Sequence, residues 1–502
     1  MSRTIAVLAL DQGTTGSTAL VLARDGRILG RAYSEFTQHF PRSGWVEHDA
    51  EEIWETTQRV AREALEAARN QEPFQAAAVG ITNQRETLVL WDRQTGRPVH
   101  RAIVWQDRRT AALCRELKEA GHEEEVRRRT GLLLDPYFTG TKLTWIFREE
   151  PELLRRAQAG ELACGTIDSW LIWKLTGGEV HATDPTNASR TLLHDLDTGD
   201  WHPDLLDLLG VPRGILPEIR RSAGDFGVST GEALGVEVPV AGVAGDQQAA
   251  LWGQGCWEAG LAKNTYGTGA FLLLNTGPDP VHSSHGLLTT VACDARGGRV
   301  HALEGSVFVA GAAIQWLRDQ LGVLERADDS EALARSLDDN DGVYLVPAFV
   351  GLGAPHWDPE ARGLLTGLTR GTTRAHLARA ALEAMAYSTA EVLEAMEADS
   401  GVRAQELRVD GGASANDWLM HFQAGILDCP VRRPAQVETT ALGAAGLAGV
   451  HTGVWEEPAD FLGALGQPRR FEPRMADDRR ERLRAGWTRA LEASRQLGSN
   501  GG

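Results

Sequence analysis

Cysteine is scarce in this sequence and follows no pattern. The 502 residues include five cysteines, which are odd in number and scattered along the chain. They form no C-x-x-C pair, so their spacing predicts neither a disulfide framework nor a structural zinc site. We therefore expect a protein of a reducing compartment, the cytoplasm.

Long hydrophobic runs are also missing. No stretch approaches about eighteen uninterrupted apolar residues, so we expect no membrane insertion. The N-terminus carries Arg3, a short apolar run and then Asp11, without a small-residue cleavage site. That pattern is not typical of a secretory signal peptide.

Positive charge is in deficit. The 51 lysines and arginines are outnumbered by 69 aspartates and glutamates, which gives a net charge of −18. Nucleic-acid binding depends on neutralising many phosphates, so this balance predicts no nucleic-acid partner. A single nucleotide is not excluded, because backbone amides and a metal ion can hold it. The content of 42% hydrophobic and 24% charged residues is typical of a globular protein.

The stretch from Ala9 to Leu22, ALDQGTTGSTALVL, is the first feature that points to chemistry. Two apolar runs flank a turn rich in Gly, Thr and Ser, which predicts a strand, a tight turn and a strand. Glycines expose backbone N–H groups and the hydroxyls add donors, so the turn suits a phosphate. Asp11 at the mouth of the turn is placed to hold Mg²⁺. The alternative is an ordinary polar hairpin turn, and this stretch alone does not decide between the two.

Two further glycine turns lie in the second half of the chain. The turn from Tyr266 to Gly269 leads into an apolar strand, as the first turn does, and Val409 to Asn416 joins a strand to a helix. Neither hairpin turn fits G-x-x-x-x-G-K-[ST], which excludes a P-loop. Such turns in both halves are expected of two related domains that face one ligand in a cleft. We predict these domains at residues 1–250 and 251–502.

The apolar pattern predicts mixed sheets covered by helices. The first part reads β-β-β-α-β, and residues 105–235 predict a mostly helical insertion. A strand returns before residue 246 and two more flank the second hairpin turn. The predicted strands are residues 4–10, 18–22, 28–33, 77–82, 87–91, 238–243 and 270–274, with one from 261, and the main predicted helices run from Asp49 to about 69 and over 374–398.

Three groups of residues are candidates for an acceptor site. Asp246 follows a strand, and it either accepts a proton from a hydroxyl nucleophile or caps a helix. Arg85 and Glu86 end another strand, and they either grip a small polyol or form a surface ion pair. Three aromatic side chains either wall this site or belong to the core. They are Trp105, Tyr137 and Phe271.

With these residues in view, the chain resembles the FGGY carbohydrate kinases over nearly its whole length, to about residue 455. Each motif is weak alone, but their common order is specific. The motifs are ALDQGTTGS, GWVEHD, GITNQRET, AIVWQDRRT, DPYFTGTKLTW, AGDQQAALWGQ, KNTYGTGAF, VPAFVGLGAPHWDPEARG, RVDGGASAN and TTALGAAGLAG. The resemblance implies an α/β fold of two actin-like (ribonuclease H-like) ATPase domains, each with a mixed central sheet, facing a nucleotide cleft.

Within the family the motifs look most like those of members that phosphorylate glycerol. The resemblance implies ATP, Mg²⁺ and glycerol as ligands, with Asp246 as the base for the terminal hydroxyl and Mg²⁺ near Asp11. It also implies a homo-oligomer, a dimer or a tetramer. The implied glycerol-binding residues are Arg85, Glu86, Tyr137, Asp246 and Gln247, with Trp105 and Phe271 against the carbon skeleton. The implied ATP-binding residues are Thr14, Thr15, Gly16, Thr268, Gly311, Gln315, Gly412 and Asn416.

Two other functions remain open from the sequence. One is an FGGY kinase for another acceptor, such as a pentulose or erythritol, and the other is an actin-like ATPase switch that needs no polyol site. The pair Arg85 and Glu86, together with Tyr137, favours glycerol.

The first turn departs from the family pattern. Many members have Ser-Ser-Arg after the two threonines, where this chain has Gly16, Ser17 and Thr18. The missing arginine usually reaches the nucleotide phosphates. We therefore expect phosphate binding here to depend more on backbone amides and the metal.

The segment before the AGDQQ motif also departs from part of the family. Relatives inhibited by fructose 1,6-bisphosphate carry a glycine-rich basic loop there, whereas this chain reads GEALGVEVP from Gly231 to Pro239, without an arginine. We predict weak or no inhibition by this compound. Rates of glycerol phosphorylation with and without the bisphosphate test the prediction, and strong inhibition would refute it. The histidine used for phosphotransferase-system activation in some relatives is likewise unmatched near Ser222 to Phe226.

Overall fold

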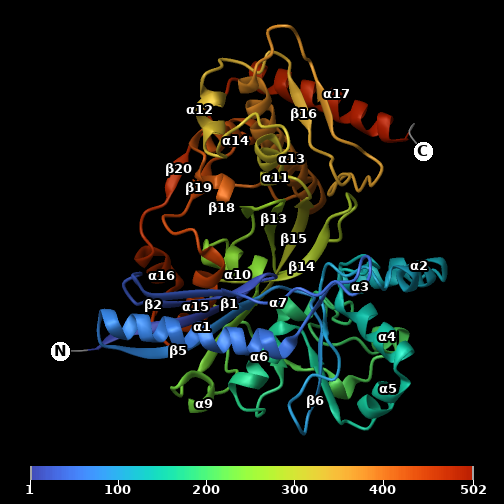
Figure 1. Cartoon of the computed structure of the whole chain (residues 1–502), viewed down its shortest axis with the longest axis vertical. Coiled ribbons are helices and arrows are strands. Elements are labelled where there is room, and N and C mark those ends of the chain that lie inside the picture. The colour runs from blue at the N-terminus through green and yellow to red at the C-terminus, as the bar shows by residue number, and fades with distance from the viewer. Residues whose placement is uncertain (1–2, 500–502) are drawn as a thin grey trace.

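The computed structural model describes residues 3–499, which fold into two lobes (Figure 1). The lower lobe in that view is built around a five-stranded sheet. Its strand order is β11 (Val240–Gly245), β5 (Phe74–Asn83), β1 (Thr4–Gln12), β2 (Gly16–Ala23) and β3 (Ile28–Glu35). The pairs β1–β2 and β2–β3 are antiparallel, and β1–β5 and β5–β11 are parallel. The predicted mixed sheet and its strand–turn–strand start are therefore confirmed.

The upper lobe contains a seven-stranded sheet. Its strand order is β14 (Leu288–Cys293), β15 (Arg299–Val307), β13 (Ala270–Gly277), β12 (Leu261–Tyr266), β18 (Glu406–Gly411), β19 (Val431–Arg433) and β20 (Arg469–Phe471). The β12–β18 and β18–β19 pairs are parallel and the others are antiparallel.

The two sheets repeat one arrangement. The order β15-β13-β12-β18-β19 has the same sequence of antiparallel and parallel pairs as β3-β2-β1-β5-β11. The turn after β1 and the turn after β12 therefore occupy equivalent positions in the two lobes. This duplication, which is faint in the sequence, is plain in the topology.

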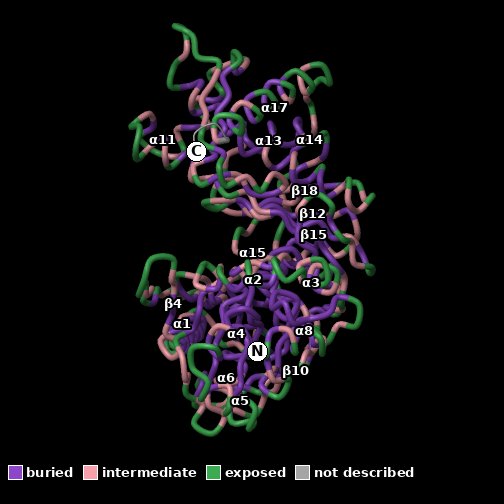
Figure 2. The backbone as a smooth tube through the Cα atoms, turned by 90° about the vertical axis from the view of Figure 1, so that its right-hand side faces the viewer, coloured by how far each residue is buried: buried purple, intermediate pink, exposed green. Residues whose placement is uncertain are grey.

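Each sheet is covered on both faces, because its buried residues alternate in direction. Leu8 and Leu10 of β1 pack toward α1 (Ala50–Gln71), whereas Val7 and Ala9 pack toward α15 (Thr439–His451). In the second sheet, Leu272, Leu274 and Leu303 pack toward α13 (Arg374–Ser400). Figure 2 shows the buried backbone continuing from one lobe to the other beside β12 and β15.

Two equivalent helices lie between the sheets. α10 (Asp246–Gly253) follows β11 and α15 follows β19, and the two helices pack against each other. Small residues allow this close approach. A methyl group added at Gly443 would lie 1.9 Å from the carbonyl oxygen of Ala249, and one at Gly80 would lie 2.1 Å from that of Ala444. A helix from the last quarter of the chain is thus seated on the first sheet.

The remaining elements surround these layers. The small two-stranded sheets pair β4 (Glu47–His48) with β7 (Ala102–Ile103), β6 (Val89–Asp92) with β8 (Leu162–Gly165), β9 (Ala182–Thr183) with β10 (Glu218–Ile219), and β16 (Tyr344–Val346) with β17 (Leu364–Thr366). The helices of the predicted insertion are α2 (Ala111–Glu119), α3 (Glu123–Thr130), α4 (Thr139–Glu149), α5 (Pro151–Gln158), α6 (Ile167–Leu175), α7 (Pro185–Ala188), α8 (Pro203–Leu209), η1 (Arg213–Ile215) and α9 (Gly231–Leu234). Later helices are α11 (Gly311–Asp319), α12 (Asp329–Arg335), η2 (Gly412–Ala415), α14 (Asp417–Leu427), α16 (Pro458–Ala464) and α17 (Asp477–Ser499).

The helix signals in the sequence are confirmed. The Asp49 side chain accepts hydrogen bonds from the backbone of Glu51 and Glu52 at the start of α1. Gly401 ends α13 in the left-handed conformation. The strand predicted from residue 87 begins at Val89 and pairs with β8 instead of extending the large sheet, because the left-handed backbone at Glu86 turns the chain.

No helix within residues 3–499 is long and apolar enough to cross a membrane.

The seat of α15 on the first sheet leads to a stability prediction. In a Gly80→Ala variant the new methyl group meets the carbonyl of Ala444, which is helix backbone and cannot move aside alone. We expect the free energy of unfolding to fall by about 1–3 kcal/mol. The matched control is Gly463→Ala in α16, where no atom lies near the added methyl, and where alanine is expected to stabilise by about 0.5–1 kcal/mol. Urea unfolding of both variants measures this, and equal stabilities would contradict it.

Candidate active site

Arg85 and Glu86 leave the end of β5 and are buried. Their side chains are each 2% exposed, which excludes the surface ion pair considered from the sequence. Glu86 has a φ of 61°, a strained value for a residue with a side chain. Its carbonyl oxygen accepts hydrogen bonds from Thr139 at 3.1 Å and Lys142 at 3.0 Å. The strained turn is therefore held by α4 from behind.

Four buried side chains close a ring of alternating charge around this turn. Arg85 lies 2.5 Å from Glu304, which lies 3.0 Å from Arg190. Arg190 in turn lies 2.6 Å from Glu86, which lies 3.8 Å from Arg85. The arginines and Glu86 come from the first half of the chain, and Glu304 comes from β15 of the second sheet. We refer to Arg85, Glu86, Arg190 and Glu304 as the charge ring.

The charge ring sets the ionisation of its carboxyl groups. Burial opposes the charged form of Glu304, but the Arg190 and Arg85 guanidinium groups outweigh it and lower its pKa to about 2. Burial raises the pKa of Glu86, against the pull of Arg190 and Arg85. Burial also raises the pKa of Tyr137, and the nearby Glu86 adds to that shift. Tyr137 is therefore a neutral hydroxyl beside the ring.

Asp246 is attached to the ring and faces outward. It is the first residue of α10, and its Oδ1 accepts from the Gln247 backbone at 2.7 Å and lies 3.1 Å from Arg85 Nε. Its side chain is 33% exposed, and its Oδ2 has no hydrogen-bond partner within residues 3–499. The Asp246 side chain does not make the usual N-cap bonds to α10, because Gly245 holds the capping position. Asp246 thus keeps a free carboxylate oxygen beside an arginine.

Gln247 is oriented by a cation from the second sheet. The buried Lys263 Nζ of β12 donates to Gln247 Oε1 and to Thr265 Oγ1. Because an ammonium group cannot accept, the Gln247 oxygen must face Lys263 and its NH₂ group must face away. Burial lowers the pKa of Lys263 to about 8, opposed by Asp410 and Asp246. The amide of Gln247 is therefore fixed as a donor toward the space beside Asp246.

The predicted aromatic wall is partly assembled. The Trp105 and Tyr137 rings meet edge to face at 5.5 Å, and Trp105 Nε1 donates to Thr14 Oγ1 at 2.9 Å. This bond ties the acceptor wall to the first phosphate turn. Phe271 comes from the other lobe, on β13 opposite Ser306, and shares its sheet face with Glu304.

The first turn has the form expected of a phosphate-binding hairpin. Gly13 N donates to Gly16 O at 2.9 Å, which closes the turn and leaves the Thr14 and Thr15 amides unpaired within the described chain. A methyl group at Gly16 would lie 2.7 Å from the Ser34 carbonyl and 2.8 Å from the Tyr33 ring. Many family members have serine at this position. In this chain the Tyr33 ring occupies the space that a serine side chain at position 16 would need.

Asp11 has the properties of a metal ligand that lacks a counter-charge. Its carboxylate is partly buried and has no hydrogen bond or ion pair with any described residue. Burial, together with the charge of Asp246, raises the pKa of Asp11 to about 7. Residues 3–499 contain no cluster of three or more His, Cys, Asp or Glu suited to a metal. This donor set fits Mg²⁺, which keeps waters and binds one or two carboxylates together with phosphate oxygens.

The predicted nucleotide-binding residues of the second half gather at one edge of the second sheet. Gly311 N, at the start of α11, donates to Gly267 O, and Ala310 N donates to Thr268 O at 2.8 Å. A methyl group at Gly411 would lie 2.2 Å from Tyr266 O, so the third turn also abuts the end of β12. Thr268, Gly412 and Gln315, one turn along α11, are exposed at this edge.

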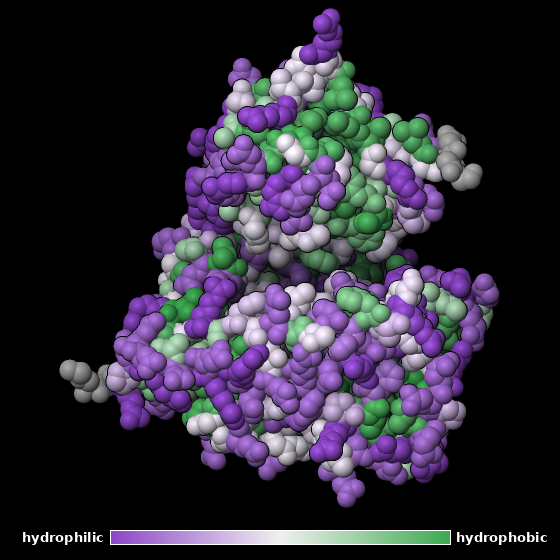
Figure 3. Space-filling view, in the orientation of Figure 1, coloured by the Kyte–Doolittle hydropathy of each residue, from purple (hydrophilic) through white to green (hydrophobic). Residues whose placement is uncertain are grey.

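Asn416 is placed at the same edge and also has a structural role. It caps α14, with its Oδ1 accepting from Leu419 N at 2.9 Å. In the space-filling view a hollow lies between the lobes that carry these turns (Figure 3).

Arg190, Glu304 and Lys263 were not identified from the sequence. Glu304 and Lys263 carry a signal in the sequence, because a charged residue inside an apolar strand needs a partner. Glu304 stands in ALEGS and Lys263 in LAKNTY, both on buried strands. The partner of each of these residues depends on how the strands pair, and strand pairing cannot be read from the sequence.

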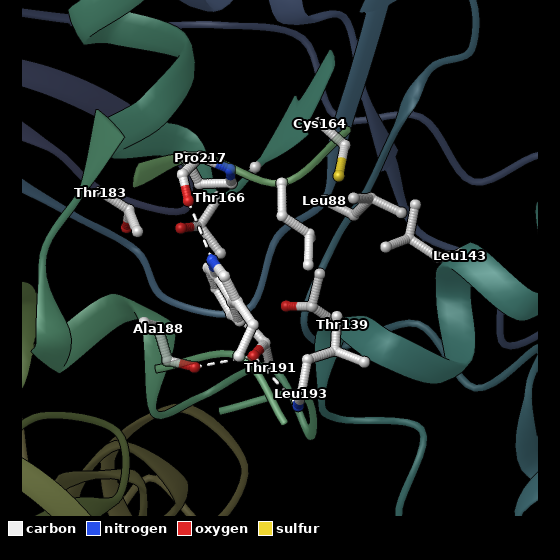
Figure 4. Close-up of a pocket in the computed structure, with 13 residues that line it drawn as sticks. Leu88, Thr139, Leu143, Cys164, Thr166, Thr183, Ala188, Thr191, Leu193 and Pro217 are labelled. Carbon is white, nitrogen blue, oxygen red and sulfur yellow. Dashed lines mark hydrogen bonds between the residues drawn. The ribbon is translucent and has the colours of Figure 1, made fainter. Parts of the chain in front are cut away.

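A small cavity lies next to the strained turn at Glu86. Its volume is about 10 Å³, enough for about one water molecule, and it is lined by Leu88, Thr139, Cys164 and Thr191 among others (Figure 4). It is too small for a substrate.

Comparison with known proteins places these features in one family. Models of the N-terminal and C-terminal domains of the FGGY family of carbohydrate kinases match residues 6–253 and 262–452. A glycerol kinase of Dechloromonas aromatica is 58% identical and one of Deinococcus radiodurans is 56% identical, each over 97% of both chains. The crystal structure of Plasmodium falciparum glycerol kinase with ADP matches with a TM-score of 0.94 at 33% identity, covering 98% of this chain and 99% of that one. The predicted α/β class with two actin-like domains is confirmed.

The unpaired Asp11 generates a prediction that needs no activity assay. Its pKa is raised in the folded state, so folding disfavours the ionised form, and this cost grows as the pH rises from about 4 to 7. An Asp11→Asn variant without Mg²⁺ should therefore be more stable than the parent at pH 8, by on the order of 1 kcal/mol or more, with a smaller difference at pH 5.

Thermal unfolding in EDTA at both pH values measures this difference. Added Mg²⁺ is the control, and it should stabilise the parent but not the Asn variant. A stability difference that is the same at pH 5 and pH 8 would contradict the assignment.

Proposed function

We propose that this chain, which belongs to the FGGY family of carbohydrate kinases, transfers the γ-phosphoryl group of ATP to glycerol and forms sn-glycerol 3-phosphate and ADP. This is the first step of glycerol catabolism. The chain is an enzyme, a glycerol kinase by its similarity to such kinases over nearly its full length. The observation that carries the acceptor is the contact of the buried Arg85 with the one-third exposed Asp246, whose Oδ2 atom has no partner among the described residues.

The acceptor is gripped by groups of fixed polarity. Arg85 and the Gln247 amide donate to hydroxyl oxygens, and Glu86 and Asp246 accept from hydroxyl hydrogens. Tyr137 is held neutral, so its hydroxyl serves as donor or acceptor. Trp105 and Phe271 contact the carbon skeleton. A small polyol carries hydroxyls on adjacent carbons, and each hydroxyl can accept from one of these donors and donate to one of these carboxylates.

Asp246 is the proposed base. Its free Oδ2 accepts the proton of the terminal hydroxyl as that oxygen attacks phosphorus, while Oδ1 stays bonded to the Gln247 backbone. A carboxylate is intrinsically a weak base. A weak base suffices, because phosphoryl transfer depends mainly on positioning and on neutralising charge.

The nucleotide is proposed to lie between the two hairpin turns. Thr14, Thr15 and Gly16 from one lobe and Thr268 from the other face its phosphates, and Gly311, Gln315, Gly412 and Asn416 surround the remainder. Asp11 is proposed to hold Mg²⁺, which when bound supplies positive charge to the phosphates. In this assignment residues 1–250 carry the acceptor-binding groups other than Phe271 together with the first phosphate turn, and residues 251–502 carry the rest of the nucleotide site.

We further propose a cytoplasmic homo-oligomer, a dimer or a tetramer. All five cysteines are unpaired and buried, which agrees with a reducing compartment.

The role of Asp246 is tested by Asp246→Asn. Removing the base should lower kcat by about 10²–10⁴-fold, while glycerol affinity changes far less, because a base acts in the transition state. Steady-state kinetics together with calorimetric glycerol binding measure the two effects separately. Near-normal kcat would return Asp246 to a structural role at the start of α10.

The acceptor is tested with the unmodified protein. Glycerol, erythritol and a ketopentose are offered with MgATP, and glycerol is expected to be turned over fastest. Faster turnover of the ketopentose would overturn the assignment. ATP consumption equal with and without glycerol would point to a switch instead of a kinase.

A further inference from the structure

Glu304 is the one member of the charge ring that comes from the second lobe. Its side chain is fully buried, and its register partners on β13 and β14 are Leu273 and Leu288. No acceptor-binding residue lies next to it in sequence. It nevertheless reaches across the lobe boundary to Arg85 and Arg190, which both belong to the first half.

Most of the donors of Arg85 are committed. Nη1 donates to Gln248 Oε1 at 3.2 Å and Glu304 Oε2 at 2.5 Å, and Nη2 donates to Glu304 Oε1 at 3.1 Å. Nε lies 3.1 Å from Asp246 Oδ1. The contact of Nε with Asp246 is an ion pair without a hydrogen bond, so besides the Nε–H group only one N–H group of Nη2 remains for a substrate hydroxyl. The fork of Arg85 is held in place by Glu304, and its edge touches Asp246.

This geometry separates two arrangements of Arg85. With Glu304 in place, the guanidinium is bidentate to Glu304 and contacts Asp246 only through Nε. Without the Glu304 charge, the strongest anions in reach are Asp246 and Glu86, and the fork would turn toward them. That turn would occupy the carboxylates that the acceptor needs and remove the free N–H from its place.

We propose that Glu304 is a positioning residue of the acceptor site, which clamps Arg85 and Arg190 from the second lobe so that Arg85 presents one N–H group to the acceptor and leaves Asp246 Oδ2 free. This inference rests on the proposed function. It makes the acceptor site a product of both lobes, since the first lobe supplies the polar binding groups and Glu304 of the second lobe fixes their direction. Acceptor binding is thereby coupled to the way the lobes meet.

The test is Glu304→Gln, which keeps the shape and removes the charge. We expect KM for glycerol to rise by about tenfold or more, because a hydrogen bond to a charged group is weakened, while KM for ATP changes less than about twofold. Glu304→Asp keeps the charge with a shorter reach and should restore part of the glycerol affinity. Calorimetric measurement of glycerol binding should rank the affinities of the parent, Glu304→Asp and Glu304→Gln in the same order, without turnover.

The matched control is Glu383→Gln. Glu383 of α13 is equally buried and lies 2.7 Å from Arg379, but it belongs to the core of the upper lobe. Its loss should lower the melting temperature and leave KM for glycerol unchanged. If Glu304→Gln changes neither KM nor affinity for glycerol, or if both KM values rise together in both variants, the positioning role is overturned.

The same experiment separates this inference from the proposed function. Parent enzyme that does not phosphorylate glycerol refutes the function itself, and the variants then have no bearing on it. Parent enzyme that does so, with a Glu304→Gln variant that binds glycerol equally well, refutes only the role of Glu304. If Glu304→Gln does not fold, Glu304→Asp decides, since it should bind glycerol more weakly than the parent and ATP equally well.

Discussion

The charge ring is the constraint on which the rest of the site depends. Burying four ionisable side chains costs several kcal/mol for each one that is charged, and their mutual attraction returns this only if every member is in place. Arg85 and Arg190 balance Glu86 and Glu304, each at a distance of 3.8 Å or less from its neighbours. Such a ring contributes little to net stability, but it specifies one arrangement. It fixes the strained turn at Glu86 and the direction of Arg85.

The ring also divides the carboxylates into different roles. Glu304 is held ionised by two arginines, whereas Asp11 has no cation and its pKa rises to about 7. Asp246 stands between them, touched by one arginine edge and one-third exposed. The anchor, the proposed base and the proposed metal ligand thus share one functional group, and they differ in how many positive charges the fold places beside each.

Much of this could be predicted from the sequence, and the remainder could not for a physical reason. The turn after Asp11, the equivalent turn at Thr268 and the helix cap at Asp49 are encoded within a few neighbouring residues, so local pattern finds them. Arg85, Glu86 and Asp246 were candidates from their places at strand ends, and the motif resemblance implied their roles. Glu304 was missed because its partners depend on which strand lies beside β13 and on which face points toward α10, and both follow from long-range pairing. The close packing of α15 against Gly80 could not be predicted from the sequence for the same reason.

The position of the ring also limits how the lobes can move. In the proposed function, the turn at Thr268 and the turn at Thr14 have to meet around the nucleotide. The ring joins β15 to the turn after β5, and Ser189 and Thr290, 3.1 Å apart, join α7 to β14 nearby. Separating the lobes at this edge would strand buried charges without partners, which is far more costly than bending elsewhere. We therefore expect any closing motion to pivot near the ring, so that the nucleotide side changes most while the acceptor groups keep their places.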